Sequence, residues 1–476
     1  MFVISRRTLT AGASLVALGV TAACSDSNNN GPTEPPPAAG VATLSGSIGT
    51  DRTLSADTTY TLSGFVKVAN GATLTIEPGT RIVGDPDVAG SSLWILRGAK
   101  IDAQGTADKP IVFTSAREPG SRKPGDWGGI VIVGNGVLNR TANPIFTEGP
   151  TGAAENYAGG TSNDDNSGTL RYVRIEFAGY DVSNGGGQEL NSLSSYAVGR
   201  GTTYDYIQSM AGLDDSFEFF GGAVDAQHLV SYEAGDDHFD WTEGFSGRGQ
   251  FLIAFQSTVL QPNAGAGTVS SDPRGFEGDG CEVEKAGCTF ANSPYSMPVW
   301  ANFTVIGPGP GVFAKTDGNG AVIRRGSGAT FVNGIIARWP GVGVSIRDTE
   351  SNTLRTMDSL MVRNVILADN GSNFEPAGTN FGSLLDDPAN DIQSITGAGS
   401  AAALFASLDP AALDFTPSAG SAAGTGGLST FTSVIANRVE NIFGAAGNNM
   451  SATSYIGAID PAGPKWYQGW TVYSAN

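Results

Sequence analysis

The segment GLDDSFEFFGG (212–222) is followed by a near copy, AGDDHFDWTEG (234–244). The two copies align without gaps at an offset of 22 residues, and acidic, aromatic and glycine residues occupy matching places. Repeats of about 20–50 residues are typical of solenoids, in which each repeat buries its apolar face against the next one. The pair therefore predicts two successive coils of one stacked structure.

Short apolar segments recur on both sides of this pair. Val173, Ile207, Leu229 and Leu252 lie in equivalent segments and are spaced by 34, 22 and 23 residues. Strands this short, separated by glycine-rich turns, fit the coils of a parallel β-helix, and the longer steps fit coils with inserted loops. We therefore expect an all-β solenoid over residues 41–476, with an Ala/Gly/Ser-rich insertion or cover at 380–430.

Stacking also predicts where particular side chains lie. Asn302, Asn333 and Asn364 are spaced by 31 residues at a turn-like place, where their amides are expected to stack as a ladder. Trp466 and Trp470, near the end of the chain, are expected to cap the last coil.

Alternation along the strands predicts the inside and the outside of the coils. Phe217 and Phe219 flank Glu218, so the two rings are expected on the inner side and the carboxylate on the outer side. Trp241 aligns with Phe219 at the offset of 22 residues and is expected inside as well.

The composition argues against nucleic-acid binding. Of 476 residues, 67 are glycine and only 15% are charged, and 46 acidic against 27 basic residues give a net charge of −19. Such a chain repels nucleic acid and anionic membrane surfaces and attracts cations. No nucleic-acid partner is therefore expected.

The N-terminus predicts export. Residues 1–23 combine a basic start, a short apolar stretch and small residues before Cys24, as in a lipoprotein signal peptide whose cysteine is lipidated. An arginine pair in this segment also fits a twin-arginine signal, so the export route stays open. Residues 24–40 form a polar, Pro-rich flexible tether, and Ser25 after Cys24 favours the outer membrane. We expect a protein of the cell envelope that is held to the membrane by its lipid.

Two further cysteines remain once Cys24 carries the lipid. Cys281 and Cys288 are seven residues apart, and no additional Cys or His lies near them in the sequence. In an exported protein, such a pair is expected to close a small loop as a disulfide.

Several motifs resemble those of one protein family. They are GDWGGIVIVG at 125–134, SGTLRYVRIEFAG at 167–179, the DDxFEFFGG stretch within 212–222, RGFE at 274–277, and YIGA at 455–458 with WYQGWT at 466–471. Together they resemble a family of exported bacterial lipoproteins and surface proteins, from about residue 41 to the end. The resemblance implies a right-handed, single-stranded parallel β-helix and export, but no particular reaction.

The acidic residues of the duplicated segment form the predicted functional site. Stacked coils place like charges about 4.8 Å apart, where they repel by about 4 kcal/mol at an effective dielectric constant near 20. No Lys or Arg lies between Arg200 and Arg248, so a bound cation is expected. Ca²⁺ suits the place because it accepts about six to eight oxygens in irregular geometry. The alternatives are that Arg248, Arg274 or the Arg324–Arg325 pair approaches in space, or that the row is exposed to water. The predicted ligands are Asp214, Asp215, Glu218, Asp236, Asp237 and Asp240.

Three kinds of function stay open. The favoured one is a calcium-stabilised surface protein with a binding or structural role, directed at polysaccharide. The second is a calcium-dependent polysaccharide lyase or glycoside hydrolase, with Arg248 or Arg274 as a base or Asp237 as a catalytic carboxylate. Polygalacturonase-type hydrolases also need Gly-His-Gly and Arg-x-Lys, and the chain has neither. The third is an adhesion or assembly subunit, and the sequence does not name a ligand.

Overall fold

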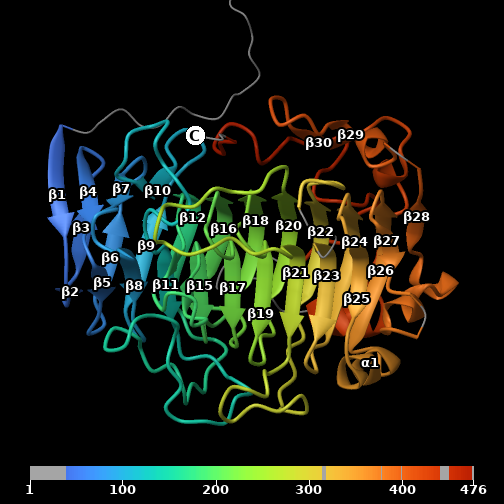
Figure 1. Cartoon of the computed structure of the whole chain (residues 1–476), viewed down its shortest axis with the longest axis horizontal. Coiled ribbons are helices and arrows are strands. Elements are labelled where there is room, and N and C mark those ends of the chain that lie inside the picture. Colours follow the sequence, from blue (N-terminus) through green and yellow to red (C-terminus); the bar gives the residue numbers. More distant parts are fainter. Residues whose placement is uncertain (1–38, 314–317, 377, 398, 440–449, 474–476) are drawn as a thin grey trace, which may run out of the picture.

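The computed structural model of the chain describes residues 39–313, 318–376, 378–397, 399–439 and 450–473. The predicted signal peptide, Cys24 and nearly all of the predicted tether lie outside them. The described chain winds into a parallel β-helix, whose coils follow one another along the long axis of Figure 1. The predicted right-handed parallel β-helix is confirmed. Among these residues, no helix is long and apolar enough to cross a membrane.

A complete coil contributes to three faces, and equivalent strands of successive coils pair in parallel. A 15-stranded sheet forms two of the faces, and an 11-stranded sheet forms the third. The strands of the large sheet are β1 (Gly40–Leu44), β3 (Arg52–Leu54), β4 (Thr58–Leu62), β6 (Thr73–Ile76), β7 (Arg81–Gly84), β9 (Lys100–Gln104), β10 (Ile111–Ser115), β12 (Gly168–Glu176), β16 (Thr203–Met210), β18 (Asp225–Tyr232), β20 (Arg248–Phe255), β22 (Val299–Ile306), β24 (Ala329–Ala337), β26 (Leu360–Ala368) and β28 (Gln393–Ile395).

The smaller sheet carries the acidic residues. Its strands are β2 (Ser47–Ile48), β5 (Phe65–Val68), β8 (Ser92–Ile95), β11 (Ile130–Val133), β15 (Leu193–Tyr196), β17 (Phe217–Phe220), β19 (Phe239–Thr242), β21 (Arg274–Asp279), β23 (Asn319–Arg324), β25 (Val342–Ile346) and β27 (Ser372–Phe374). The remaining described elements are the hairpins β13 (Tyr180–Asp181)–β14 (Glu189–Leu190) and β29 (Phe405–Ser407)–β30 (Asp414–Pro417), the helices α1 (Thr349–Thr356) and α2 (Ser433–Val439), and the 3-10 turns η1 (Gly382–Leu385), η2 (Pro388–Asn390), η3 (Ala402–Leu404) and η4 (Ala422–Gly424).

From β12 to β26, each long strand of the large sheet bends between two faces at one residue with positive φ. These residues are Tyr172, Tyr206, His228, Phe251, Asn302, Asn333 and Asn364, with φ between 48° and 62°. The rings of Tyr172, Tyr206 and His228 stack face to face, with centroids 4.4 and 4.1 Å apart. Asparagine tolerates this backbone conformation better than most residues, which explains its place in the later coils.

Asn302, Asn333 and Asn364 lie at equivalent bends of successive coils and bond to backbone groups, as predicted, but their amides do not form a ladder. Among the described residues, no hydrogen bond joins Asn302, Asn333 and Asn364 to one another. The amide of Asn333 instead accepts from the backbone N–H of Leu428 at 2.7 Å, and its Nδ2 donates to Thr453. The amides therefore bind the C-terminal part of the chain, which lies against this bend.

Inward-facing rings fill the solenoid, as the alternation predicts. Phe217, Phe239 and Phe276 stack in register on β17, β19 and β21, with centroids 5.6 and 5.3 Å apart. Phe219 and Trp241 are buried in the same core. Each such side chain contributes about 1.5–3 kcal/mol through burial, and the repeated column holds the coils in one register.

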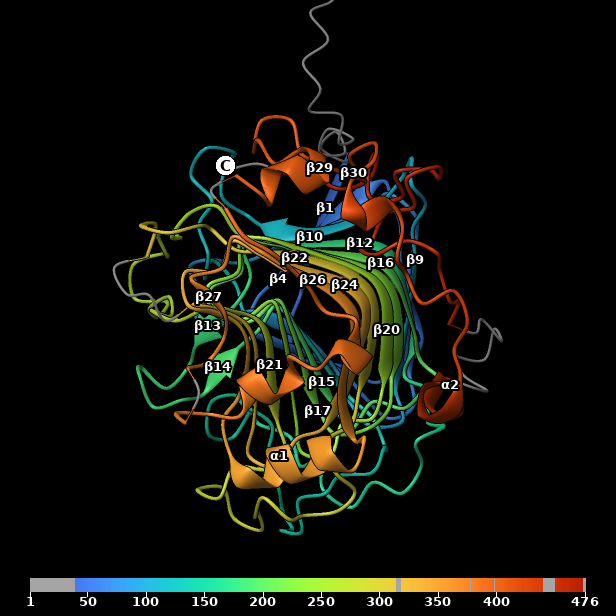
Figure 2. The same cartoon turned by 90° about the vertical axis from the view of Figure 1, so that its right-hand side faces the viewer.

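The end of the chain turns back over the outside of the solenoid and forms a C-terminal cover, residues 401–439 and 450–473. In Figure 2, β29 and β30 lie above the face that contains β22, β24 and β26. The outward side of this face is apolar, and the cover buries it in a second hydrophobic cluster. Gln208 and Gln250 hold the cover in place. The amide of Gln208 donates to the backbone oxygen of Val472 and accepts from its N–H, and the amide of Gln250 does the same at Ser451.

The cover corrects two expectations. Trp466 and Trp470 do not cap the last coil, because they pack edge-on against the early bend residues His228 and Tyr172, at 4.9 and 5.6 Å. Within the Ala/Gly/Ser-rich segment, β28 pairs with β26 and so belongs to the last coil. The coils therefore end near β28.

Candidate functional site

The outward carboxylates of β17, β19 and β21 form one column. Glu218 pairs in register with Asp240, and Asp240 pairs with Glu277. The predicted stacking of the two copies is therefore confirmed. Glu277 extends the column, although it lies 37 residues beyond Asp240, because a long loop is inserted before β21. We call Glu218, Asp240 and Glu277 the acidic column.

The aspartates before β17 and β19 form a second row beside the column. Oδ1 of Asp215 accepts from the backbone N–H of Asp237 at 2.8 Å, and Oδ1 of Asp237 accepts from the backbone N–H of Arg274 at 2.6 Å. The amide of Asn191 makes the same bond to the N–H of Asp215 at 3.1 Å. One oxygen of each carboxylate is thus used to join two coils.

The remaining oxygens converge in three overlapping groups. Within each group, one carboxylate oxygen per residue lies within 4.8 Å of the others. The groups are Asp214–Asp215–Asp236, Asp215–Glu218–Asp240 and Asp237–Asp240–Glu277. All six predicted metal ligands therefore lie in one continuous cluster, together with Glu277.

Arginines compensate only one end of this cluster. Nη1 of Arg274 lies 3.2 Å from Oδ2 of Asp237 and 2.6 Å from Oε1 of Glu277. Arg324 pairs with Glu277 at 2.9 Å and with Asp279 at 2.8 Å. Both arginines come from later coils. The alternative that arginines approach in space is therefore confirmed for this end of the cluster.

The other end has no such compensation. In the described part of the chain, no Lys or Arg forms an ion pair with any member of the open end of the cluster, which we define as Asp214, Asp215, Glu218, Asp236 and Asp240. Glu218 accepts a hydrogen bond from Nδ2 of Asn191 at 2.5 Å. Oδ1 of Asp236 and Oδ1 of Asp240 are buried and have no hydrogen-bond partner among the described residues.

Burial changes the acidity of the cluster. It raises the pKa of Asp214, Asp215, Glu218 and Asp240 well above the usual range, and neighbouring carboxylates add to the effect. Burial also raises the pKa of Asp236 to about 7, although Arg274 opposes it. In each group the loss of water outweighs any opposing charge from Lys285, Arg274 or Arg324. Burial therefore favours the protonated form of the open end unless a metal ion takes the place of the protons.

The structure separates the candidate catalytic residues. Arg274 lies beside the acidic cluster, whereas Arg248 lies at the start of β20, with Asp225 as its ion-pair partner at 3.7 Å. His238, which follows Asp237, points into the core: its Nδ1 bonds to Ser231 at 2.5 Å, and burial lowers its pKa to about 3. His238 therefore cannot reach the outer face.

A small pocket adjoins the acidic column next to Phe220. Its volume is about 130 Å³, and it is lined by Arg140, Phe146, Glu148, Tyr157, Gln188, Tyr196, Phe220 and Lys285. Tyr196 stacks on Phe220 with centroids 4.2 Å apart. Burial raises the pKa of Glu148 to about 7 against the opposing charge of Lys285.

This pocket could not be predicted, because its residues come from the long loop after β11, from the β13–β14 hairpin, from β15 and β17, and from the loop after β21. The predicted disulfide between Cys281 and Cys288 is present and closes that last loop. Nζ of Lys285, within the disulfide loop, lies 5.8 Å from the centre of the Phe220 ring.

Two solved tailspike structures are similar to part of the chain at low identity. The chain is similar to the enzymatically active domain of tailspike protein 2 of bacteriophage CBA120, with 14% identity over 71% of this chain and 42% of that one, and a TM-score of 0.25. The full-length tailspike protein 2 of an Escherichia coli O157:H7 bacteriophage gives 12% identity, 71% and 37% coverage, and a TM-score of 0.21. The chain thus spans less than half of either structure. No curated protein matches it. The model of the pectate-lyase-like β-helix domain family matches residues 46–407, and the chain belongs to that family.

Proposed function

We propose that the protein is a calcium-stabilised binding module of the cell envelope, directed at polysaccharide. Membership in a pectate-lyase-like family supports a polysaccharide-directed role. The protein's own geometry supports the metal. Of the two alternatives for the acidic rows, arginines account for one end only. Oδ1 of Asp236 and Oδ1 of Asp240 are buried, which argues against simple exposure to water.

One observation carries the calcium proposal. The open end brings five carboxylates together without an ion-pair partner among the described residues. They form two groups of three that share Asp215, and within each group one oxygen per residue lies within 4.8 Å of the others. The donors are all hard oxygens, with no Cys or His ligand, which suits Ca²⁺ better than Zn²⁺. Asp215, Glu218 and Asp240 would hold the ion, and Asp214 and Asp236 would complete the set. The ion would link the coils of β17 and β19.

Co-sedimentation with insoluble polysaccharide tests the binding role. The full chain is mixed with an insoluble uronate polysaccharide or with cellulose, in Ca²⁺ or in EDTA. We expect strong retention on the uronate polymer in Ca²⁺ and weaker retention in EDTA. Asp240→Asn should lower retention, and Asp108→Asn, at an exposed carboxylate away from the cluster, should not. If no form is retained on either polymer, the proposed binding is contradicted.

The lyase alternative is less well supported by the geometry. A lyase base must lose its proton, and burial alone would favour this at Arg274. The carboxylates of Asp237 and Glu277 outweigh burial and hold the pKa of Arg274 above its ordinary value. Burial lowers the pKa of Arg248 to about 10, but Arg248 lies away from the acidic cluster. Release of unsaturated products from a panel of uronate polysaccharides, followed by ultraviolet absorbance, would overturn the non-enzymatic proposal.

Export and lipid anchoring are also part of the proposal. They rest on residues 1–23 and Cys24, which precede the described chain. A lipid on Cys24 would hold the solenoid at the outer membrane through the tether. Metabolic labelling with a radioactive fatty acid tests this: the wild-type chain should be labelled and sediment with outer membranes, and Cys24→Ser should do neither. Labelling of Cys24→Ser would contradict the assignment.

A further inference from the structure

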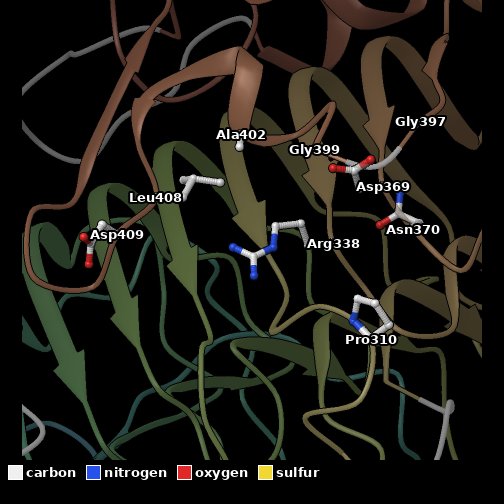
Figure 3. A pocket seen from close by; sticks show the side chains of 9 residues that line it. All are labelled: Pro310, Arg338, Asp369, Asn370, Gly397, Gly399, Ala402, Leu408 and Asp409. Carbon is white, nitrogen blue, oxygen red and sulfur yellow. The ribbon is translucent and has the colours of Figure 1, made fainter.

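A second recess lies away from the acidic cluster, where the C-terminal cover meets the corner that follows β24 and β26. Figure 3 shows the residues that line it: Pro310, Arg338, Asp369, Asn370, Gly397, Gly399, Ala402, Leu408 and Asp409. Its volume is about 690 Å³. Pockets for small molecules typically have about 300–1,000 Å³.

The guanidinium of Arg338 occupies the middle of this ring of residues (Figure 3). Its one hydrogen bond among the described residues runs from Nη2 to the backbone oxygen of Pro308, at 3.4 Å. No described carboxylate lies within ion-pair distance of it. Arg274 and Arg324, in contrast, are each paired with two or more carboxylates. In a chain with a net charge of −19, an arginine without an acidic partner that faces a recess stands out.

The other polar side chains around Arg338 already have partners. Asp369 accepts from the Ser400 hydroxyl at 2.6 Å and from the backbone N–H of Ala401 at 2.7 Å. Asn370 accepts from the backbone N–H of Trp339 and donates to the backbone oxygen of Ile336. Arg338, with five N–H donors and one hydrogen bond, therefore has the most donor capacity left for a ligand.

The surroundings of Arg338 define the chemistry of the ligand. A planar guanidinium binds a carboxylate through two parallel hydrogen bonds. Asp369 and Asp409 on the rim disfavour a doubly charged phosphate, but their carboxylates accept hydrogen bonds from hydroxyl groups. Pro310, Ala402 and Leu408 form the apolar part of the wall. We infer that this recess is a second binding site, which takes a singly charged, hydroxylated carboxylate of monosaccharide size. It is independent of the acidic cluster and of calcium.

Titration of the full chain with three matched sugars in EDTA tests the site. The probes are glucuronate, glucose and glucose 6-phosphate, and binding is followed by calorimetry or by ligand-observed NMR. We expect glucuronate to bind at least tenfold more tightly than either of the others. Equal binding of glucose, or tighter binding of glucose 6-phosphate, would overturn the inference. Because calcium is absent, this result does not depend on the fate of the proposed calcium site.

Variants locate the binding. Arg338→Gln should remove the preference for glucuronate. Arg355→Gln is the matched control, since Arg355 on α1 also has no ion pair among the described residues and lies outside the recess. Ala402→Trp keeps Arg338 but fills the recess from an exposed position, and it should abolish binding too. This second variant keeps the test valid if Arg338→Gln does not fold. Unchanged glucuronate affinity in either Arg338→Gln or Ala402→Trp would contradict the site.

Discussion

Glu218 lies directly over Asp240 in the parallel register of β17 and β19. Neither carboxylate has a Lys or Arg ion-pair partner among the described residues, yet the next member of the acidic column, Glu277, has both Arg274 and Arg324. The column therefore has one end that the protein itself compensates and one end that it does not. Because of this difference, the predicted change in stability on substitution at the open end has opposite signs with and without calcium.

Asp240→Asn should have opposite effects with and without calcium. In EDTA at pH 8 the substitution removes a half-buried carboxylate that must either bind a proton or repel Glu218 and Glu277, so the free energy of unfolding should rise by roughly 1–3 kcal/mol. In saturating Ca²⁺ the variant lacks a ligand and should be less stable than the wild type. Urea unfolding in both buffers measures this. Asp108→Asn should change stability in neither, and a loss of stability for Asp240→Asn in EDTA would contradict the account.

The stability of the calcium-free protein should fall as the pH rises. Asp236 has a pKa of about 7 in the folded chain and 3.8 as its ordinary value, so the folded state holds the proton more tightly than the unfolded state does. The stabilisation is complete below about pH 4 and is lost as the pH rises through about 7, at roughly 1 kcal/mol per pH unit for each such group. Urea unfolding in EDTA at several pH values between 5 and 8 checks this. A free energy that increases over this range would show that the cluster is not protonated as described.

Arg274→Gln should be strongly destabilising. Arg274 is 7% exposed and pairs with Asp237, Asp272 and Glu277. Removal of one partner from a buried ion pair typically costs about 3–5 kcal/mol, because the remaining charges stay buried. Arg274→Lys should recover part of this, and Arg355→Gln serves as the control. A loss below about 1 kcal/mol for Arg274→Gln would mean that other groups compensate this end.

Trp470→Ala should loosen the C-terminal cover and leave the coils folded. The indole is buried and packs edge-on against Tyr172 and Tyr206, at 5.6 and 6.0 Å. Its truncation should weaken the cover by about 3–5 kcal/mol. In limited proteolysis, cleavage within 450–473 should become faster while the solenoid fragment persists. Gln468→Ala, at an exposed position of the same segment, should be cleaved like the wild type. Equal cleavage of all three would contradict the role of Trp470.

The periodic part of the fold could be predicted from the sequence. The offset of 22 residues between Glu218 and Asp240 is the length of one coil without inserted loops, and alternation placed Phe217 inside and Glu218 outside. Pairing of Cys281 with Cys288 followed from the export signal and from their spacing. Each of these depends on local sequence or on one uninterrupted repeat.

Features that depend on interrupted repeats could not be predicted. Glu277 reaches the cluster only because the loop before β21 adds residues to that coil, so its distance from Asp240 in the sequence is not one repeat. The approach of Arg274 was open as an alternative, but the carboxylates that it pairs with could not be assigned. The asparagine spacing was recognised, but it reflects a backbone bend with positive φ rather than an amide ladder. The places of Trp466 and Trp470 depend on the reversal of the chain over an apolar outer face, which no repeat encodes.

Calorimetric titration of the EDTA-treated full chain with CaCl₂ is the most direct test of the central claim, that a calcium ion compensates the open end of the acidic cluster. We predict saturable binding to the wild type and to Asp108→Asn, and at least a tenfold loss of affinity in both Asp215→Asn and Asp240→Asn. Absence of binding to the wild type, or an unchanged affinity in Asp240→Asn, would contradict it.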